Sequence, residues 1–241
     1  MLTRQVTAAL DRWGIVPDDS AGRPLGLSAP GRLVQQVAAL LGQRPMLDAV
    51  LALLKHPLSF TGGDRANHLR LTRELELSLR RFGPVFPDGK AILDWAAARK
   101  DSDVAMPWAR ALASVLDDAA RAGTMSLADH VAMHRALAEA VARGERPVGT
   151  GEIWEKEAGK AVRLAMDTLA VEADAGGTLT VAEYADLFRT YISTGEVREP
   201  VLAHPGIRIL GTIEARVLGA DIVILGGLNE GIWPDLPAPD P

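Results

Sequence analysis

From about residue 31 to residue 192, the apolar residues of this chain recur every three or four positions, and glycine, proline and short polar turns interrupt the pattern. This spacing places apolar side chains on one face of a helix, so it predicts a series of amphipathic helices. With one more near the amino terminus, the expected helices cover residues 3–13, 30–41, 45–55, 64–82, 89–99, 105–122, 126–143, 152–173 and 181–192. Thr180 and Glu183 have the spacing of a capping box at the start of the last helix.

Residues with β-strand character lie near the two ends of the chain. Residues 207–210 and 222–225 are short apolar runs rich in β-branched side chains, and two glycines follow the second run. The second run predicts a strand buried on both faces, as in a parallel α/β sheet. Residues 15–24 are dense in turn formers and leave room for only a short strand or hairpin. We therefore expect an α/β fold with mostly helical content.

The composition excludes several kinds of site. The 241 residues carry 26 Lys and Arg against 31 Asp and Glu, so a net charge of −5 provides no overall positive field for nucleic acid. Because the sequence contains no cysteine, disulfides and thiolate metal sites are excluded, and the cytoplasm is the expected location. No apolar stretch approaches the roughly 20 residues of a membrane-spanning helix. His130 and His134 have a metal-ligand spacing without an H-E-x-x-H motif, so we expect no metal site.

One stretch of the chain is locally basic. Between residues 55 and 81, six basic residues stand against three acidic ones: Lys55, Arg65, Arg70, Arg73, Arg80 and Arg81 against Asp64, Glu74 and Glu76. Such a local excess favours contacts with phosphates, and Arg65, Arg73, Arg80 and Arg81 are the candidates. The alternative is an ordinary solvated helix face.

Polar residues near the carboxyl end are further candidates. Arg216 is a candidate for a phosphate contact that Glu214 would orient, or the two residues form an ion pair that ties a loop to the sheet. Asn229 and Glu230 follow the second predicted strand, at the end where ligands gather in open α/β sheets, so they line either a nucleic-acid channel, a domain interface or a simple turn. Trp233 either stacks on a base or packs against the protein.

Several segments resemble proteins of known families. Residues 10–17, L-D-R-W-G-I-V-P, are similar to the L-x-x-x-G-I-P element of UvrD-like helicases, and residues 216–223 stand where those proteins have K-G-L-E-F. A closer resemblance is to the AddB subunit of bacterial AddAB helicase–nucleases, in the form found in alphaproteobacteria. It rests on residues 13–22, 56–58, 74–81 and 225–234, the last of which reads L-G-G-L-N-E-G-I-W-P.

The resemblance implies a specific architecture. The chain would be part of a RecA-like superfamily-one helicase motor domain with a large all-helical insertion. Residues 1–30 would begin the second motor domain, residues 31–200 would form the inserted accessory domain, and residues 201–241 would return to the motor domain. The chain would then be an internal piece of a larger polypeptide.

The motor motif departs from that of a working helicase. Val217 and Gly219 stand where K-G-L-E has Gly and Glu, and Arg216 and Leu218 keep the character of the motif. No G-x-x-x-x-G-K-[ST] phosphate loop occurs in the sequence. The resemblance therefore implies a non-catalytic scaffold that binds single-stranded DNA during double-strand break repair. The competing hypothesis is a stand-alone helical interaction module with no role on DNA.

The resemblance also implies partners and cofactors. An AddA-type helicase–nuclease subunit would be the protein partner, and DNA ends would be the substrate of the complex. ATP and Mg²⁺ would bind to the partner subunit, and an iron–sulfur cluster would lie in a carboxyl-terminal nuclease domain. No cofactor is expected within these 241 residues.

Overall fold

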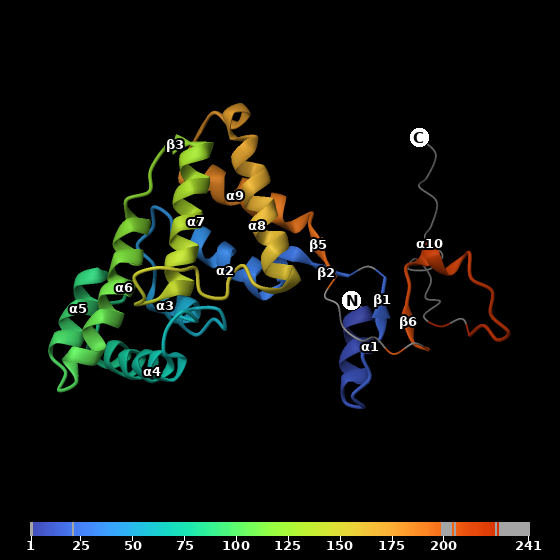
Figure 1. The fold of residues 1–241 in the computed structure, drawn as a ribbon, viewed down its shortest axis with the longest axis horizontal. Coiled ribbons are helices and arrows are strands. Elements are labelled where there is room, and N and C mark those ends of the chain that lie inside the picture. The colour runs from blue at the N-terminus through green and yellow to red at the C-terminus, as the bar shows by residue number, and fades with distance from the viewer. Residues whose placement is uncertain (1, 21, 199–203, 205, 225, 227–241) are drawn as a thin grey trace. The chain divides into compact units, whose positions relative to one another are not determined.

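The computed structural model describes residues 2–20, 22–198, 204, 206–224 and 226, and these residues are mostly helical with a few two-residue strands (Figure 1). The chain divides into two units. The smaller unit combines Met1–Ala21 with Leu202–Pro241, and the larger unit is Gly22–Val201. None of the helices in the described part of the chain is long and apolar enough to cross a membrane.

Strand pairing joins the two ends of the chain within the smaller unit. This unit contains helix α1 (Leu2–Asp11), strand β1 (Asp18–Asp19), strand β6 (Arg208–Ile209) and the short helix α10 (Thr212–Ala215). Strands β1 and β6 are parallel, with Asp18 opposite Arg208, and the Asp18 N–H donates to the Ile207 carbonyl at 2.9 Å. The strand predicted near residues 207–210 is confirmed, although it is only two residues long.

The prediction of a buried strand at residues 222–225 is wrong for its described part. Residues 222–224 form no strand, and their side chains are exposed. A strand buried on both faces needs hydrogen-bonded neighbours on both sides. Among the described residues of the smaller unit, β1 and β6 pair only with each other, so this apolar run has no neighbouring strand. Leu225 lies outside the described residues.

Among the described residues of the larger unit, eight longer helices form its body. They are α2 (Ala29–Ala38), α3 (Leu47–Leu54), α4 (Arg65–Phe82), α5 (Gly89–Ala97), α6 (Ser102–Ala120), α7 (Leu127–Arg143), α8 (Lys156–Val171) and α9 (Val181–Ser193). Two 3-10 helices, η1 (Leu25–Leu27) and η2 (Ala173–Gly176), accompany them. Each of the eight lies at a predicted helix, so the helical pattern of the sequence is confirmed with small differences at the ends.

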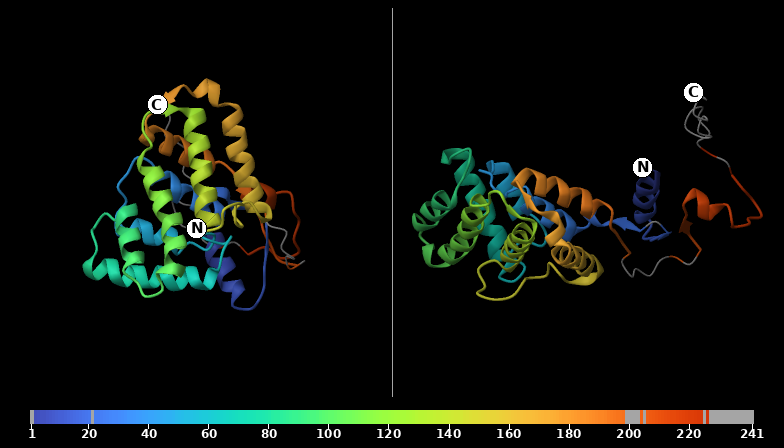
Figure 2. Two further views of the ribbon diagram at one scale, coloured as in Figure 1. Left: turned by 60° about the vertical axis from the view of Figure 1, so that its left-hand side comes forward. Right: turned by 90° about the horizontal axis from the view of Figure 1, so that it is seen from above.

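Two short antiparallel strand pairs tie the larger unit together. Strand β2 (Arg23–Pro24) pairs with β5 (Glu196–Val197), which brings the beginning and end of this unit side by side (Figures 1 and 2). Strand β3 (Met125–Ser126) pairs with β4 (Thr178–Leu179) beside the start of α7. The β2–β5 pairing lies just inside the two limits of the larger unit, Gly22 and Val201.

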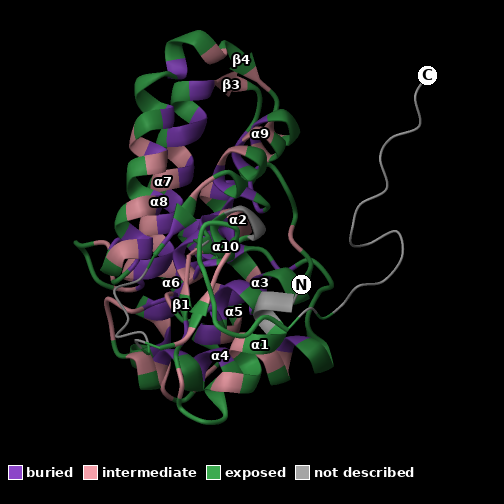
Figure 3. Ribbon diagram, turned by 90° about the vertical axis from the view of Figure 1, so that its right-hand side faces the viewer, coloured by how far each residue is buried: buried purple, intermediate pink, exposed green. Residues whose placement is uncertain are grey.

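The buried residues form two hydrophobic clusters, and they lie on the faces that the helices turn toward one another (Figure 3). Helices α2, α7, α8 and α9 supply most of the first cluster, which includes Leu33, Val141, Val162 and Phe188. Helices α3, α4, α5 and α6 supply most of the second, which includes Leu71, Leu75, Ile92 and Trp108. Since α6 also contributes Val115 and Ala119 to the first cluster, this helix connects the two.

Buried histidines are hydrogen-bonded within these clusters. His134 Nε2 lies 2.7 Å from the Val34 carbonyl oxygen, and its Nδ1 lies 2.8 Å from the Tyr184 hydroxyl. His130 Nε2 lies 2.9 Å from the carbonyl oxygen of Leu179 in β4. The four-residue spacing of these histidines therefore serves packing between α7 and its neighbours. In the described part of the chain, no group of three His, Asp or Glu side chains is placed to hold a metal ion.

The predicted capping box at the start of α9 is confirmed. The Thr180 hydroxyl accepts from the Glu183 N–H at 3.3 Å, and the Glu183 carboxylate accepts from the Thr180 N–H at 2.8 Å. We expect Thr180→Ala to lower the free energy of unfolding by about 1 kcal/mol, because one N–H at the helix start loses its acceptor. Urea unfolding followed by circular dichroism measures the change. Thr180→Ser keeps the hydroxyl and should stay within a few tenths of a kcal/mol of the parent; equal losses in both variants would contradict the capping role.

Candidate nucleic-acid interface

Helix α4 carries most of the basic residues singled out in the sequence. It begins after Asp64, whose carboxylate accepts from the Asn67 N–H at 3.1 Å, and it ends before Gly83. Leu71, Leu75 and Leu79 recur every four residues and are buried in the second cluster. Because side chains four apart share one face of a helix, the opposite face of α4 is turned to solvent.

A second four-residue series lies on the exposed face of α4. It consists of Leu69, Arg73, Leu77 and Arg81, and Phe82 follows at the end of the helix. These five residues are called the α4 stripe below. Leu77 is 64% exposed and Phe82 is 82% exposed. The stripe therefore alternates apolar and basic side chains on an accessible surface.

The two arginines of the stripe make no ion pair with any described residue. The Arg81 guanidinium carbon lies 5.8 Å from the centroid of the Phe82 ring, within the range of a cation–π contact. Arg73 and Arg81 are eight residues apart, which is about 12 Å along the helix axis. The stripe thus presents two available guanidinium groups, with an exposed phenyl ring beside the second.

Other basic residues of the predicted patch are occupied by the protein itself. The Arg65 guanidinium donates to the carbonyl oxygen of Ser59 and, at 3.1 Å, to that of His56. Burial lowers the pKa of Arg65 from its usual value, as expected for a group that holds a loop against the helix. Arg65 therefore holds residues 56–59 against the start of α4.

Acidic side chains neutralise the remaining cations of the patch. Arg80 donates to Glu76 at 3.0 Å and to Asp48 at 3.2 Å, and the Glu76 hydrogen bond is the main reason that the pKa of Arg80 is raised. Lys55 lies 2.6 Å from Glu76, and its hydrogen bond is the main cause of the lowered pKa of Glu76. Arg70 pairs with Asp101 at 3.0 Å. Of the six basic residues between 55 and 81, only Arg73 and Arg81 form neither an ion pair nor a hydrogen bond with the described residues through their side chains.

The remaining candidate residues belong to the smaller unit. The Glu214 carboxylate accepts from the Gly211 N–H at 2.9 Å and from the Ser20 hydroxyl, so it joins the start of α10 to the residue after β1. Arg216 is exposed just beyond α10. Asn229, Glu230 and Trp233 lie outside the described residues.

Geometry and charge define a helical unit in which the exposed face of α4 carries Arg73 and Arg81, and an exposed phenyl ring lies at the carboxyl end of the same helix. Guanidinium groups bind phosphates, and exposed aromatic rings stack on unpaired bases, so the stripe has the chemistry of a surface for single-stranded nucleic acid. No family model, curated protein or solved structure matches the chain.

Proposed function

We propose that the larger unit binds single-stranded DNA along the α4 stripe. In this proposal Arg73 and Arg81 contact phosphates, and Phe82 stacks on a base. The observation that carries it is the combination of two arginines without ion-pair partners in the described structure and an 82% exposed phenyl ring on the same helix. A base covering Phe82 removes apolar surface from water, and phosphates near the two arginines release counterions.

We also propose that the chain is a helicase-like, non-catalytic scaffold segment of an AddB-type subunit that acts in the cytoplasm on double-strand breaks. The similarity of residues 13–22, 56–58, 74–81 and 225–234 to that family supports this assignment. The parallel pairing of β1 with β6 supports the finer proposal of a RecA-like motor domain interrupted by a helical insertion, because it joins the two ends of the chain in one unit. An AddA-type subunit would supply the ATP and Mg²⁺ chemistry, and a nuclease domain of the parent protein would hold the iron–sulfur cluster.

The competing proposal is a helical interaction module without a role on DNA. Exposed Leu69 and Leu77 favour it, since apolar side chains on a helix face also serve contacts between proteins. The two proposals predict a different dependence of binding affinity on salt concentration. DNA binding through arginines weakens steeply as salt rises, whereas an apolar protein contact does not.

Removing the stripe's charges tests DNA binding directly. We expect Arg73→Gln/Arg81→Gln to weaken binding of the 241-residue chain to a fluorescent 30-nucleotide oligothymidine. Losing two phosphate contacts should reduce the slope of log affinity against log salt by about 1.4, at roughly 0.7 per phosphate on a single strand. Phe82→Ala should weaken binding about 5- to 150-fold, the range for one lost base–aromatic stack of about 1–3 kcal/mol. Fluorescence anisotropy between about 50 and 200 mM salt measures both effects.

The matched control removes the same charge elsewhere. Arg163 on α8 and Arg189 on α9 are exposed and pair only with acidic residues on their own helices. Arg163→Gln/Arg189→Gln should leave the affinity and the salt slope close to those of the parent chain. If the two double variants have equal affinities and equal salt slopes, the α4 stripe is ruled out as the binding surface. If the parent chain shows no measurable binding to the oligothymidine, the interaction module is favoured.

A further inference from the structure

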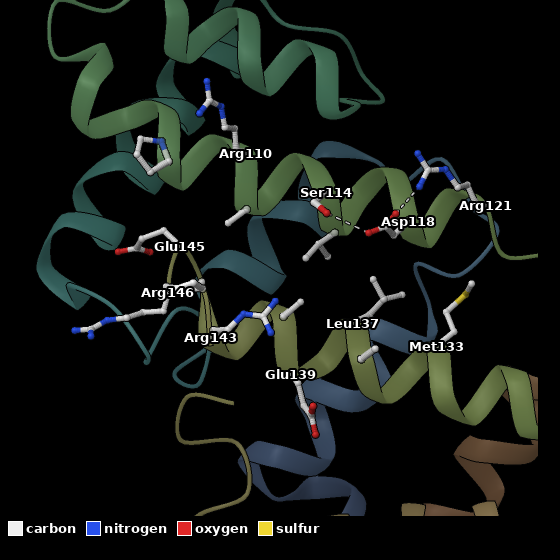
Figure 4. Close-up of a pocket in the computed structure, with 17 residues that line it drawn as sticks. Arg110, Ser114, Asp118, Arg121, Met133, Leu137, Glu139, Arg143, Glu145 and Arg146 are labelled. Atoms are coloured by element: carbon white, nitrogen blue, oxygen red, sulfur yellow. Dashed lines mark hydrogen bonds and ion pairs between the residues drawn. The ribbon is translucent and has the colours of Figure 1, made fainter. Parts of the chain in front are cut away.

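A groove of about 920 Å³ runs between α6 and α7 in the larger unit, away from the residues of the α4 stripe (Figure 4). Its floor is apolar and mostly made of small side chains: Ala111, Val115, Ala136, Leu137 and Ala140. Met133 and Leu137 project from α7 toward α6 (Figure 4). Along α6 the lining extends from Pro107 to Arg121, which corresponds to about 21 Å of helix. The groove is therefore as long as a helix of about four turns.

Two of the acidic residues that line the groove are already neutralised. Asp118 pairs with Arg121 at 2.5 Å. Glu139 pairs with Arg135 at 3.2 Å and also accepts from the Trp154 indole N–H at 2.8 Å. These carboxylates do not repel an acidic ligand as free charges would.

The end of the groove near the carboxyl terminus of α7 keeps a positive excess. Arg143 and Arg146 lie there with Glu145, and Arg110 of α6 also borders the groove. None of these three arginines forms an ion pair with any described residue. Arg143 extends from the end of α7 along the groove (Figure 4). The positive charge at this end of the groove favours a ligand with an acidic group there.

Buried polar atoms at the same end lack partners. Arg143 Nε has no hydrogen-bond acceptor among the described residues, and Glu145 Oε2 has no donor. The Arg143 guanidinium has no carboxylate or carbonyl partner among the described residues, so its charge favours a carboxylate of a ligand in the groove. The first turn of an α-helix suits this end of the groove, because acidic side chains are favoured there.

We propose that the α6–α7 groove binds an amphipathic helix of a partner protein, with the acidic first turn of that helix at Arg143 and Arg146. The apolar side chains of the partner cover Val115, Leu137 and Met133, and the alanines allow the two backbones to approach closely. The length of the groove and its apolar floor favour a helix over a nucleic-acid strand. This site is additional to the proposed DNA-binding stripe and does not depend on it.

Three labelled 16-residue peptides test the proposal against the intact 241-residue chain. The first has leucines at helical spacing and glutamates in its first turn, the second has lysines in place of the glutamates, and the third has serines in place of the leucines. Fluorescence anisotropy should show saturable binding of the first, at least tenfold weaker binding of the second and no saturation with the third. Failure of the first peptide to bind, or equal binding of the first two, would overturn the proposal.

Variants of the chain locate the site. Arg143→Glu should weaken binding of the acidic peptide at least tenfold, Arg143→Gln should weaken it less, and Ala136→Trp should block it by filling the exposed part of the floor. Arg163→Glu, the same charge change on α8, should leave binding unchanged. Equal affinities of Arg143→Glu and Arg163→Glu would refute the assignment.

Oligonucleotide binding separates this site from the α4 stripe. Arg143→Glu should bind the oligothymidine as the parent chain does, and Arg73→Gln/Arg81→Gln should bind the acidic peptide as the parent chain does. If Arg143→Glu instead loses the oligothymidine and not the peptide, the groove is a nucleic-acid site and the helix-docking proposal is wrong.

Discussion

Lowering the pH from 7 to 5 should destabilise the larger unit by several kcal/mol, because three of its buried histidines must stay uncharged in the folded state. Burial is the largest cause that lowers the pKa of His56, His68 and His134 from 6.5 to about 4. The Arg32 charge lowers the pKa of His56 further, and the Arg65 charge acts in the same direction on His56 and His68.

Hydrogen bonding explains why the neutral ring suits two of these sites, those of His68 and His134. His68 Nε2 lies 2.8 Å from the Leu54 carbonyl oxygen, which assigns the proton to Nε2, and its Nδ1 accepts from the Trp108 indole N–H at 2.9 Å. A second proton, on Nδ1, would point at the Trp108 N–H, so protonation would break this hydrogen bond. The same assignment holds for His134, whose Nε2 donates to the Val34 carbonyl oxygen.

The direction and the size of the pH effect follow from these values. Below pH 6.5 the unfolded chain binds protons that the folded protein does not, so stability is complete above pH 6.5 and is lost as the pH falls toward 4. At pH 5 each histidine contributes on the order of 2 kcal/mol of lost stability, or on the order of 6 kcal/mol for the three. That loss is comparable with the total stability of a typical domain, about 5–15 kcal/mol.

Urea midpoints at pH 7.5, 6 and 5 measure this effect. His134→Gln removes one titrating group, so it should lower the midpoint at pH 7.5 and flatten the dependence on pH by about a third. His204→Gln, at an exposed position, is the matched control and should leave the dependence unchanged. A midpoint that is constant from pH 7.5 to 5 would show that the buried histidines become protonated without cost.

Trp108→Ala should lower the free energy of unfolding by about 3–5 kcal/mol, the usual loss for a large buried aromatic residue. The Trp108 side chain is 1% exposed and packs in the second cluster, with ring centroids 5.8 Å from Phe60 and 5.9 Å from Trp95. Its removal leaves a cavity and also takes the hydrogen-bond donor from His68 Nδ1.

Two further variants make the Trp108 experiment specific. Trp108→Phe retains much of the ring but loses the indole N–H, so it should cost less than Trp108→Ala. Trp13→Ala removes the same side chain at an 80% exposed position in the smaller unit and should change stability by less than about 0.5 kcal/mol. Chemical unfolding followed by circular dichroism compares the three variants; similar losses for Trp108→Ala and Trp13→Ala would contradict the packing argument.

Local sequence patterns predicted most of the helices. Helix hydrogen bonds join residues four apart, and caps such as Thr180–Glu183 act within one turn, so the necessary information lies in short windows. Asp64 at the start of α4 and Gly83 at its end are local signals of the same kind. The short pairs β2–β5 and β3–β4 had no comparable signal, because each joins segments more than 50 residues apart.

The strand predicted at residues 222–225 shows the limit of such patterns. An apolar, β-branched run identifies a segment that is able to pair, but a strand exists only where another segment lies beside it. Residues 208–209 have such a neighbour in β1, and residues 222–224 have none in the described structure. Whether each run forms a strand depends on contacts between distant parts of the chain, and the periodicity of a short segment carries no information about those contacts.

Local sequence patterns are sufficient to predict that residues 65–82 form a helix with one apolar face, and that this helix and its surroundings carry an excess of basic residues. Which of these basic side chains stay without an acidic partner depends on the tertiary fold. Asp48 on α3 and Asp101 before α6 reach Arg80 and Arg70, and backbone carbonyls of residues 56 and 59 hold Arg65. Helix formation depends on neighbours in the chain, whereas the pairing of a charge depends on which distant groups the fold brings within a few ångströms. For that reason the broad basic stretch becomes, in the folded protein, a narrow stripe with two available arginines, Arg73 and Arg81.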